Sequence, residues 1–109
     1  MFNFGDLGNL MKQFKEIQEN VAKAKEQLAK EEIVVEVGGG MVKVIVNGLG
    51  EVLDIDIDKT LLSEENYQML KDLIIAAVNE ANERSKEVMS KKLTEAAGLP
   101  SSFGNMGLF

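Results

Sequence analysis

Three aspartates at alternate positions, Asp54, Asp56 and Asp58, have the spacing that comes nearest to a known chemistry. Together with Glu65 they follow the D-x-D-x-D…E order of an EF-hand calcium loop. The sixth loop position, where that motif needs glycine for a sharp turn, is Lys59. The preceding segment alternates as a strand, whereas the motif requires a helix. The aspartates are therefore interpreted as solvated charges on the outer face of a strand, and no metal site is predicted.

Catalysis has few candidate side chains in this sequence. The chain has no cysteine and no histidine, which removes the thiolate nucleophile and the commonest general base. The glycines at residues 38–40 resemble a phosphate-binding loop, but no Gly-Lys-Ser/Thr follows them and they open no helix. A turn explains these glycines better. No set of acid, base and nucleophile emerges, so the sequence predicts neither an enzyme nor a cofactor.

The charge balance argues in two directions about nucleic acid. A formal net charge of −6 and a pI of about 4.7 give an overall field that repels polyanions. Lys12 and Lys15, one turn apart, nevertheless form a small basic spot, and local charge can bind phosphate when the total is negative. The alternative is a solvated helix face, supported by pairs such as Glu19 with Lys23.

A small β-sheet is expected in the middle of the chain. Residues 33–58 form three alternating apolar runs, separated by the glycines at 38–40 and by Asn47-Gly48. Asn-Gly between such runs indicates a hairpin with a two-residue turn. Three strands cannot cover their own apolar faces, and the second run is apolar on both faces, so a partner chain is expected. The predicted dimer interface comprises Val42, Val44, Val46, Leu53, Ile55 and Ile57.

Two long helices are expected to flank the sheet. Apolar residues at alternating steps of three and four predict a first helix over residues 7–28, with a narrow coiled-coil-like seam and Asp6 as N-cap. Ser63 and two following acids predict the start of a second helix of roughly 35 residues, ending at Gly98, whose mostly polar far half projects. The sequence thus predicts an α+β domain of order α-β-β-β-α over residues 1–98. Residues 99–109 are expected to form a flexible apolar tail.

Short motifs spread over nearly the whole chain point to a family. They are residues 40–48 (GMVKVIVNG), 56–58 (DID) and 73–81 (LIIAAVNEA), with residues 8–13 (GNLMKQ), Leu99-Pro100 and Phe109 towards the two ends. Together they resemble the YbaB/EbfC nucleoid-associated proteins. The resemblance implies a tweezer-like homodimer in which the two sheets associate and the helices project as arms. It also implies binding to double-stranded DNA in the bacterial cytoplasm, at the nucleoid, to compact the chromosome or regulate expression.

The resemblance also implies which residues meet DNA. In that family, DNA contact is attributed to the first and last helices. Lys12 lies in a matching motif and is carried over; charge and position add Lys15, Lys23, Arg84, Lys91 and Lys92. For Lys91 and Lys92 the alternative role is to complement the dipole at a helix carboxyl end. Contacts to phosphate are expected to dominate over reading of bases.

A second function class stays open beside the DNA clamp. The helix seams, the methionines and the apolar tail can serve a protein partner, which would make the chain an acidic homodimeric interaction module, or adaptor. Neither class needs a membrane. No apolar run approaches the length that spans a bilayer, and the amino terminus lacks the basic-then-apolar order of a signal peptide. A cytoplasmic protein is therefore expected.

Overall fold

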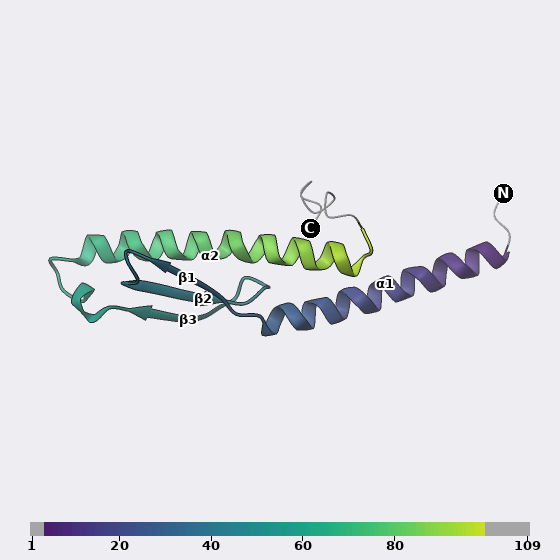
Figure 1. The fold of residues 1–109 in the computed structure, drawn as a ribbon, viewed down its shortest axis with the longest axis horizontal. Helices are drawn as coiled ribbons and strands as arrows, with labels where there is room; N and C mark the ends of the chain where they lie inside the picture. Colours follow the sequence, from purple (N-terminus) through teal and green to yellow (C-terminus); the bar gives the residue numbers. More distant parts are fainter. Residues whose placement is uncertain (1–3, 100–109) are drawn as a thin grey trace.

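The structure confirms the predicted α-β-β-β-α order. The computed structural model describes residues 4–99, so the predicted tail lies outside the described residues except for Leu99. The elements are α1 (Phe4–Lys30), β1 (Ile33–Val37), β2 (Val42–Val46), β3 (Val52–Ile57), the 3-10 turn η1 (Lys59–Leu61) and α2 (Tyr67–Ala96). The fold is elongated, with principal extents of 73 × 23 × 17 Å, and the sheet and the start of α1 lie at opposite ends (Figure 1).

The three strands form an antiparallel meander in the order β1-β2-β3. Val35 pairs with Val44, which pairs in turn with Ile55, so these side chains share one face of the sheet. The turn between β1 and β2 contains the three glycines at residues 38–40, with φ of 61°, 67° and 90°. Glycine adopts such left-handed conformations without steric cost, which explains why a turn forms where the sequence predicted one.

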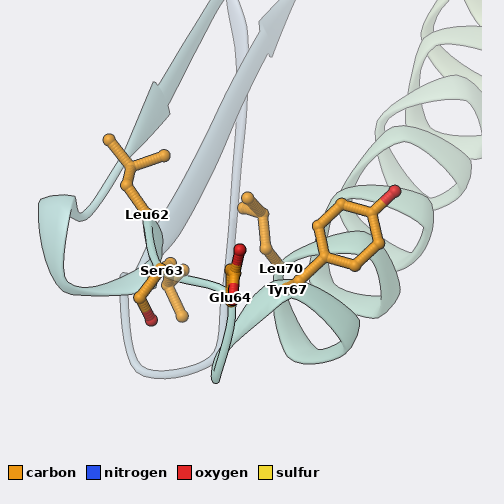
Figure 2. Close-up of a pocket in the computed structure, with 6 residues that line it drawn as sticks. Leu62, Ser63, Glu64, Tyr67 and Leu70 are labelled. Atoms are coloured by element: carbon orange, nitrogen blue, oxygen red, sulfur yellow. The ribbon is translucent and has the colours of Figure 1, made fainter.

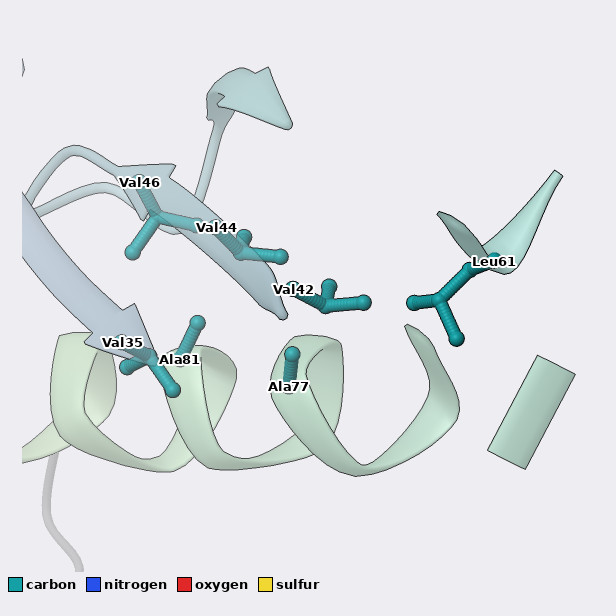
Figure 3. Packing of buried hydrophobic residues seen from close by; sticks show 7 residues of the cluster. All are labelled: Val35, Val42, Val44, Val46, Leu61, Ala77 and Ala81. Carbon is teal, nitrogen blue, oxygen red and sulfur yellow. The ribbon is translucent and has the colours of Figure 1, made fainter. Parts of the chain in front are cut away.

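α2 crosses one face of the sheet and makes the main core with it. The small side chains of Ala77 and Ala81 let the helix backbone approach the buried valines of β1 and β2, namely Val35, Val42, Val44 and Val46 (Figure 3). Leu61 of η1 completes this cluster. The helix packs mainly on β1 and β2, and every residue of β3 except Ile57 is exposed. A single chain therefore buries one apolar face of β1 and β2 but leaves β3 uncovered.

The second helix begins later than the sequence predicted. Ser63 is not its N-cap, because α2 starts at Tyr67 and the Ser63 hydroxyl accepts a hydrogen bond from the Asn66 N–H at 3.3 Å. Asp58 instead caps the short turn η1, and residues 62–66 then lead the chain to the helix. The extra turn shortens α2 to 30 residues.

The far half of α2, predicted to project, packs against α1 instead (Figure 1). Ala24 and Leu28 of α1 are buried with Leu93 of α2, surrounded by the partly buried Val21, Val88, Met89 and Ala96. Most polar side chains of this half, such as Glu83, Lys86 and Glu87, remain exposed on the other faces of the helix. Only Ser85 and Thr94 are buried, and their hydroxyls are hydrogen-bonded. The buried Thr94 hydroxyl, for example, donates to the Ser90 carbonyl at 2.7 Å.

The element that projects is the amino-terminal half of α1, residues 4–20, which we call the arm. α1 begins at Phe4, so Asp6 lies inside the first turn and the predicted N-cap is wrong. The predicted seam runs through the whole helix, but on the arm Leu10 and Phe14 are 47% and 62% exposed. None of the helices within residues 4–99 combines the length and apolar character needed to cross a membrane.

Asn47 connects the end of α1 to the sheet and to α2, an arrangement that we call the Asn47 joint. Its side-chain amide donates to the carbonyl of Ala29 at 3.2 Å, and the Gly48 N–H donates to the carbonyl of Leu28 at 2.8 Å. On the other side, the Ser85 hydroxyl of α2 donates to the Asn47 carbonyl at 3.0 Å. One loop thus fixes both helices, and with them the direction of the arm.

The hairpin between β2 and β3 is confirmed, but its predicted two-residue turn is wrong. The loop spans residues 47–51, and the glycine with positive φ, 85°, is Gly50 rather than Gly48. A Cβ at Gly48 would lie 2.6 Å from Leu28 Cδ2 and 3.0 Å from the Leu28 carbonyl oxygen. Glycine is therefore needed at Gly48 for the close approach of α1 to the loop.

Candidate nucleic-acid interface

Two of the predicted DNA-binding residues, Lys23 of α1 and Lys92 of α2, line one groove. The groove lies between the two helices, has a volume of about 380 Å³, and is lined by Asn20, Lys23, Ala24, Gln27, Lys92, Glu95 and Ala96. Each lysine directly precedes a buried residue of the helix contact, Ala24 or Leu93, so the packing of the helices places both lysines at its edge. Two lysines on facing helices can hold the oxygens of one phosphate. Glu95 in the same groove weakens that attraction.

Lys12 and Lys15 extend this basic surface along the arm. Both side chains are exposed. Lys12 and Lys23 are 11 residues apart. Since that separation is close to three helical turns, they lie on the same face of α1, about 16 Å apart along its axis. The arm therefore presents cations in a row that leads to the groove.

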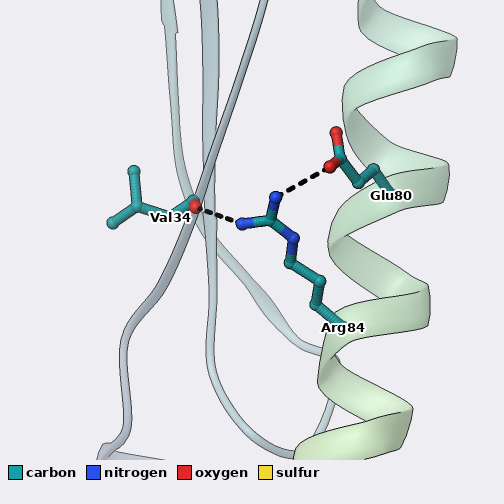
Figure 4. A network of polar contacts seen from close by, with 3 residues as sticks. All are labelled: Val34, Glu80 and Arg84. Atoms are coloured by element: carbon teal, nitrogen blue, oxygen red, sulfur yellow. Dashed lines mark hydrogen bonds and ion pairs between the residues drawn. The ribbon is translucent and has the colours of Figure 1, made fainter.

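Arg84 lies apart from these lysines, over the sheet. Its guanidinium pairs with Glu80, one turn earlier, at 2.8 Å and donates to the Val34 carbonyl of β1 at 3.3 Å (Figure 4). These contacts tie α2 to β1, and a phosphate would have to compete with Glu80 for Arg84. Lys91 is exposed in the last turns of α2, next to Lys92. The fold thus places the lysine candidates on two packed helices and separates Arg84 from them.

The negative charge of the chain is concentrated away from the helices that carry the candidate lysines. Residues 31–84, which comprise the sheet and the half of α2 that covers it, hold twelve carboxylates and four basic side chains. Residues 4–30 hold four carboxylates and five lysines, and residues 86–96 hold two carboxylates and three lysines. Exposed charges separated by more than about 8 Å are largely screened at physiological salt. Each of these two helical segments thus has one more lysine than carboxylates, whereas residues 31–84 have eight more carboxylates than basic side chains. A polyanion beside the groove between α1 and α2 therefore meets much less repulsion than one beside the sheet.

The six predicted dimer-interface residues fall into two groups. Three of them are buried in the core of the single chain, beneath α2: Val42, Val44 and Val46. The other three belong to β3, where Leu53 and Ile55 are 50% and 40% exposed and Ile57 is partly buried. Only the β3 group offers apolar surface to a partner while α2 is in place.

A second hollow, which is apolar and was not predicted from the sequence, lies at the other end of the molecule. It has a volume of about 510 Å³ and is lined by Leu61, Leu62, Ser63, Glu64, Tyr67 and Leu70 (Figure 2). The late start of α2 creates it, because the segment between η1 and α2 does not fill the space. The apolar pair Leu61-Leu62 before a helix start was the available sequence signal.

Asp58, the last residue of the calcium-like pattern, serves the local fold. Its carboxylate accepts hydrogen bonds from the Thr60 hydroxyl at 2.7 Å and from the Thr60 N–H at 2.9 Å. Both bonds favour the ionised form, the hydroxyl most, and hold the pKa of Asp58 below its ordinary value of 3.8. Within residues 4–99, no three of the potential metal-ligating side chains gather in one place.

Replacing Thr60 by alanine is expected to raise the pKa of Asp58 towards 3.8, because the largest cause of the lowered value is removed. A lowered carboxyl pKa stabilises the fold above the unfolded value, and this contribution disappears as the pH falls through the folded pKa. The part of the stability difference between wild type and Thr60→Ala that depends on ionised Asp58 should therefore vanish below that pH. An NMR titration of the Asp58 carboxyl tests this, and an unchanged pKa in the variant would contradict it.

The fold defines a class: small α+β proteins in which two long helices flank a three-stranded antiparallel sheet. Residues 3–99 match the YbaB/EbfC DNA-binding family, and the chain belongs to that family. The family resemblance found in the sequence is thereby confirmed.

Individual relatives agree with the family assignment. A nucleoid-associated protein of Sulfurihydrogenibium sp. is 63% identical over 109 residues, covering 97% of this chain and 99% of that protein. A nucleoid-associated protein of Persephonella marina is 65% identical over 107 residues, covering 98% and 97%. The crystal structure of an uncharacterized protein from Helicobacter pylori has a TM-score of 0.67 and 29% identity, covering 80% of this chain and 88% of that one. The chain is thus a member of a nucleoid-associated DNA-binding family.

Proposed function

We propose that this protein binds duplex DNA as a homodimer, through the arm and the groove between α1 and α2, and helps to organise or regulate the bacterial chromosome in the cytoplasm. The observation that carries the proposal is the separation of charge along the molecule. Five lysines lie on α1 and three within residues 86–96, whereas twelve of the eighteen carboxylates lie within residues 31–84. The acidic sheet end keeps the molecule from attracting DNA over its whole surface and directs contact to the helices.

The contacts proposed are to phosphate rather than to base edges. The candidates Lys12, Lys15, Lys23, Lys91 and Lys92 are long flexible cations, and lysine binds phosphate as a point charge. Phosphate contacts fix the position of a protein on the duplex without reading its sequence. Arg84 is the weakest of the candidates, because Glu80 and the Val34 carbonyl already hold it.

The homodimer is proposed to form through β3. This strand is at the edge of the sheet and exposes Leu53 and Ile55, which α2 leaves uncovered. An exposed apolar edge strand is a template for pairing with another chain. A dimer formed by two sheets in this way would have two arms, one from each chain, as in a clamp.

Binding of a short fluorescent duplex at several salt concentrations tests the proposal. Affinity should fall steeply with salt, because phosphate binding releases counterions. The double variants Lys12→Ala/Lys15→Ala and Lys23→Ala/Lys92→Ala should each weaken binding and lower the salt slope by roughly 0.9 for every phosphate that is no longer neutralised.

The matched control is Lys59→Ala/Lys71→Ala, which removes the same charge from exposed positions at the sheet end. Equal weakening in all three variants would show that only net charge matters, and no binding at low salt would exclude the clamp.

The alternative is an adaptor that binds another protein. The apolar hollow beside Tyr67 favours it, since its walls are leucine and tyrosine side chains on the end of the molecule away from the arm. A protein ligand there would be unaffected by the lysine variants. Loss of partner binding in Leu62→Ser, with DNA binding retained, would separate the two functions.

A further inference from the structure

The apolar seam of α1 continues beyond the part that α2 covers. Val21, Ala24 and Leu28 form the covered half, against Leu93 and its neighbours. The uncovered half belongs to the arm and consists of Leu7, Leu10, Met11, Phe14 and Ile17, all of them exposed. α2 stops at Ala96, so the seam loses its cover where that helix ends.

The borders of the uncovered seam do not suit a second helix. In the heptad that places Leu7, Leu10, Phe14 and Ile17 at the a and d positions, the e and g positions within residues 7–20 are Met11, Gln13, Gln18 and Asn20. Coiled-coil partners are usually selected by charges at these positions, and along residues 7–20 none is present; Asp6, just before Leu7, is the one charged residue at such a position in the arm. Glutamine and asparagine amides can instead hydrogen-bond the backbone of an extended segment.

The chain itself supplies a segment of matching chemistry. Residues 100–109 contain Phe103, Met106, Leu108 and Phe109 and carry no charged side chain. They follow directly on α2, whose last turn shares the groove with Asn20 and Ala24 of α1. There the helix ends in a tight cap, with Gly98 at a φ of 72° and the Leu99 N–H bonded to the Thr94 carbonyl at 3.0 Å.

Length decides which apolar surface these residues can reach. Ten extended residues span at most about 35 Å. From Asn20, beside the end of α2, to Leu7 is about 20 Å along α1, which is well within reach. The hollow beside Tyr67 is separated from Ala96 by the length of α2, about 44 Å, and is out of reach within one chain.

We propose that residues 100–109 dock on the uncovered seam of the same chain's arm, in extended form, from Ile17 towards Leu7. Docking continues the cover that α2 begins and buries the exposed side chains of Leu10 and Phe14. Lys12 and Lys15 occupy the heptad positions f and b, away from the seam, and stay exposed. The segment is thus a strap that supports the arm, and its docking does not depend on DNA.

Disulfide trapping tests this docking in the full-length protein, which has no cysteine of its own. The pair Gln18→Cys/Ser102→Cys puts one thiol beside the seam, and the control pair Glu19→Cys/Ser102→Cys puts it on the opposite face at the same height. Mild oxidation should form an intrachain disulfide at least about tenfold faster in the first pair. Equal rates in the two pairs would overturn the proposal. So would a mainly interchain product, which would assign the seam to the tail of a second copy.

Hydrogen exchange provides a readout that needs no cross-link. An unsupported helical arm is marginally stable, so removing the apolar side chains of the strap should expose its amides. In Phe103→Ser/Met106→Ser/Leu108→Ser, exchange over residues 7–17 should rise about tenfold, with residues 70–81 under the sheet unchanged. Unchanged exchange over residues 7–17 would overturn the docking, whatever the protein does with DNA.

Discussion

Replacing Asn47 by alanine is expected to lower the free energy of unfolding by roughly 3 kcal/mol, since four side-chain hydrogen bonds are lost and each contributes about 0.5–1.5 kcal/mol. Asn47 is only 2% exposed. Its amide donates to the Ala29 carbonyl at 3.2 Å and to Glu51 Oε1 at 2.9 Å. Its side-chain oxygen accepts from the N–H groups of Leu49 and Glu51 at 2.9 and 3.0 Å. Alanine can replace none of these four hydrogen bonds.

The expected destabilisation is large compared with the total stability of a small domain, about 5–15 kcal/mol. Thermal unfolding should therefore shift down by roughly 12–24 °C, at about 4–8 °C per kcal/mol for a domain near this size. Urea unfolding followed by circular dichroism measures the change. Asn79→Ala is the matched control, because Asn79 is exposed on the same fold and its replacement should change stability by less than about 0.5 kcal/mol. Similar destabilisation in both variants would contradict the role assigned to the Asn47 joint.

The same variant should also loosen the arm. The Ala29 carbonyl and the Leu28 carbonyl are the points where the loop holds the end of α1. When one of them is released, hydrogen exchange in residues 21–30 should rise more than in the sheet. An equal rise everywhere would mean that Asn47 contributes to global stability only.

Local sequence patterns predicted the elements of this fold well, because each pattern reports directly on nearby backbone. The alternating valines of β2 and the three glycines before them specify a strand and a turn without help from distant residues. Asn47-Gly48 was different. Its hairpin was predicted correctly, but its turn was not, because both residues are used for contacts with Leu28 and Ala29, which lie far away in the sequence.

Tertiary contacts explain the remaining errors. The polar far half of α2 suggested a projecting helix, yet Thr94 is buried with its hydroxyl satisfied inside its own helix. In the same way, the sequence named Lys23 and Lys92 as separate candidates, and only the packing of Ala24 on Leu93 makes them neighbours. The sequence gives the number of carboxylates directly. That most of them gather at the sheet end, apart from the candidate lysines, follows only from the arrangement of the segments in the fold.

Replacing Ile55 by glutamate is expected to convert the proposed dimer into a monomer. Ile55 is 40% exposed on β3, so the single chain should tolerate the carboxylate with little change in stability. In a dimer interface the same carboxylate would be desolvated without a partner, which is strongly unfavourable. Sedimentation equilibrium should give a mass near 12.0 kDa for the variant and twice that for the wild type. Asn79→Glu adds the same charge at an exposed position of α2 and should remain dimeric.

The monomeric variant distinguishes the effect of losing the dimer from the effect of losing single lysine contacts. Ile55→Glu keeps every lysine of the arm and groove, but the two arms of the dimer no longer act on one duplex. Linking two sites raises affinity by about 10²–10⁴. DNA affinity should therefore fall by a comparable factor, and the salt slope should fall to about half, because each monomer neutralises half as many phosphates. The lysine variants should instead stay dimeric, with a slope reduced in proportion to the lysines replaced.

An Ile55→Glu variant that is still dimeric would show that β3 is not the interface. A monomer with wild-type affinity would show that one arm suffices for binding and that the clamp is wrong.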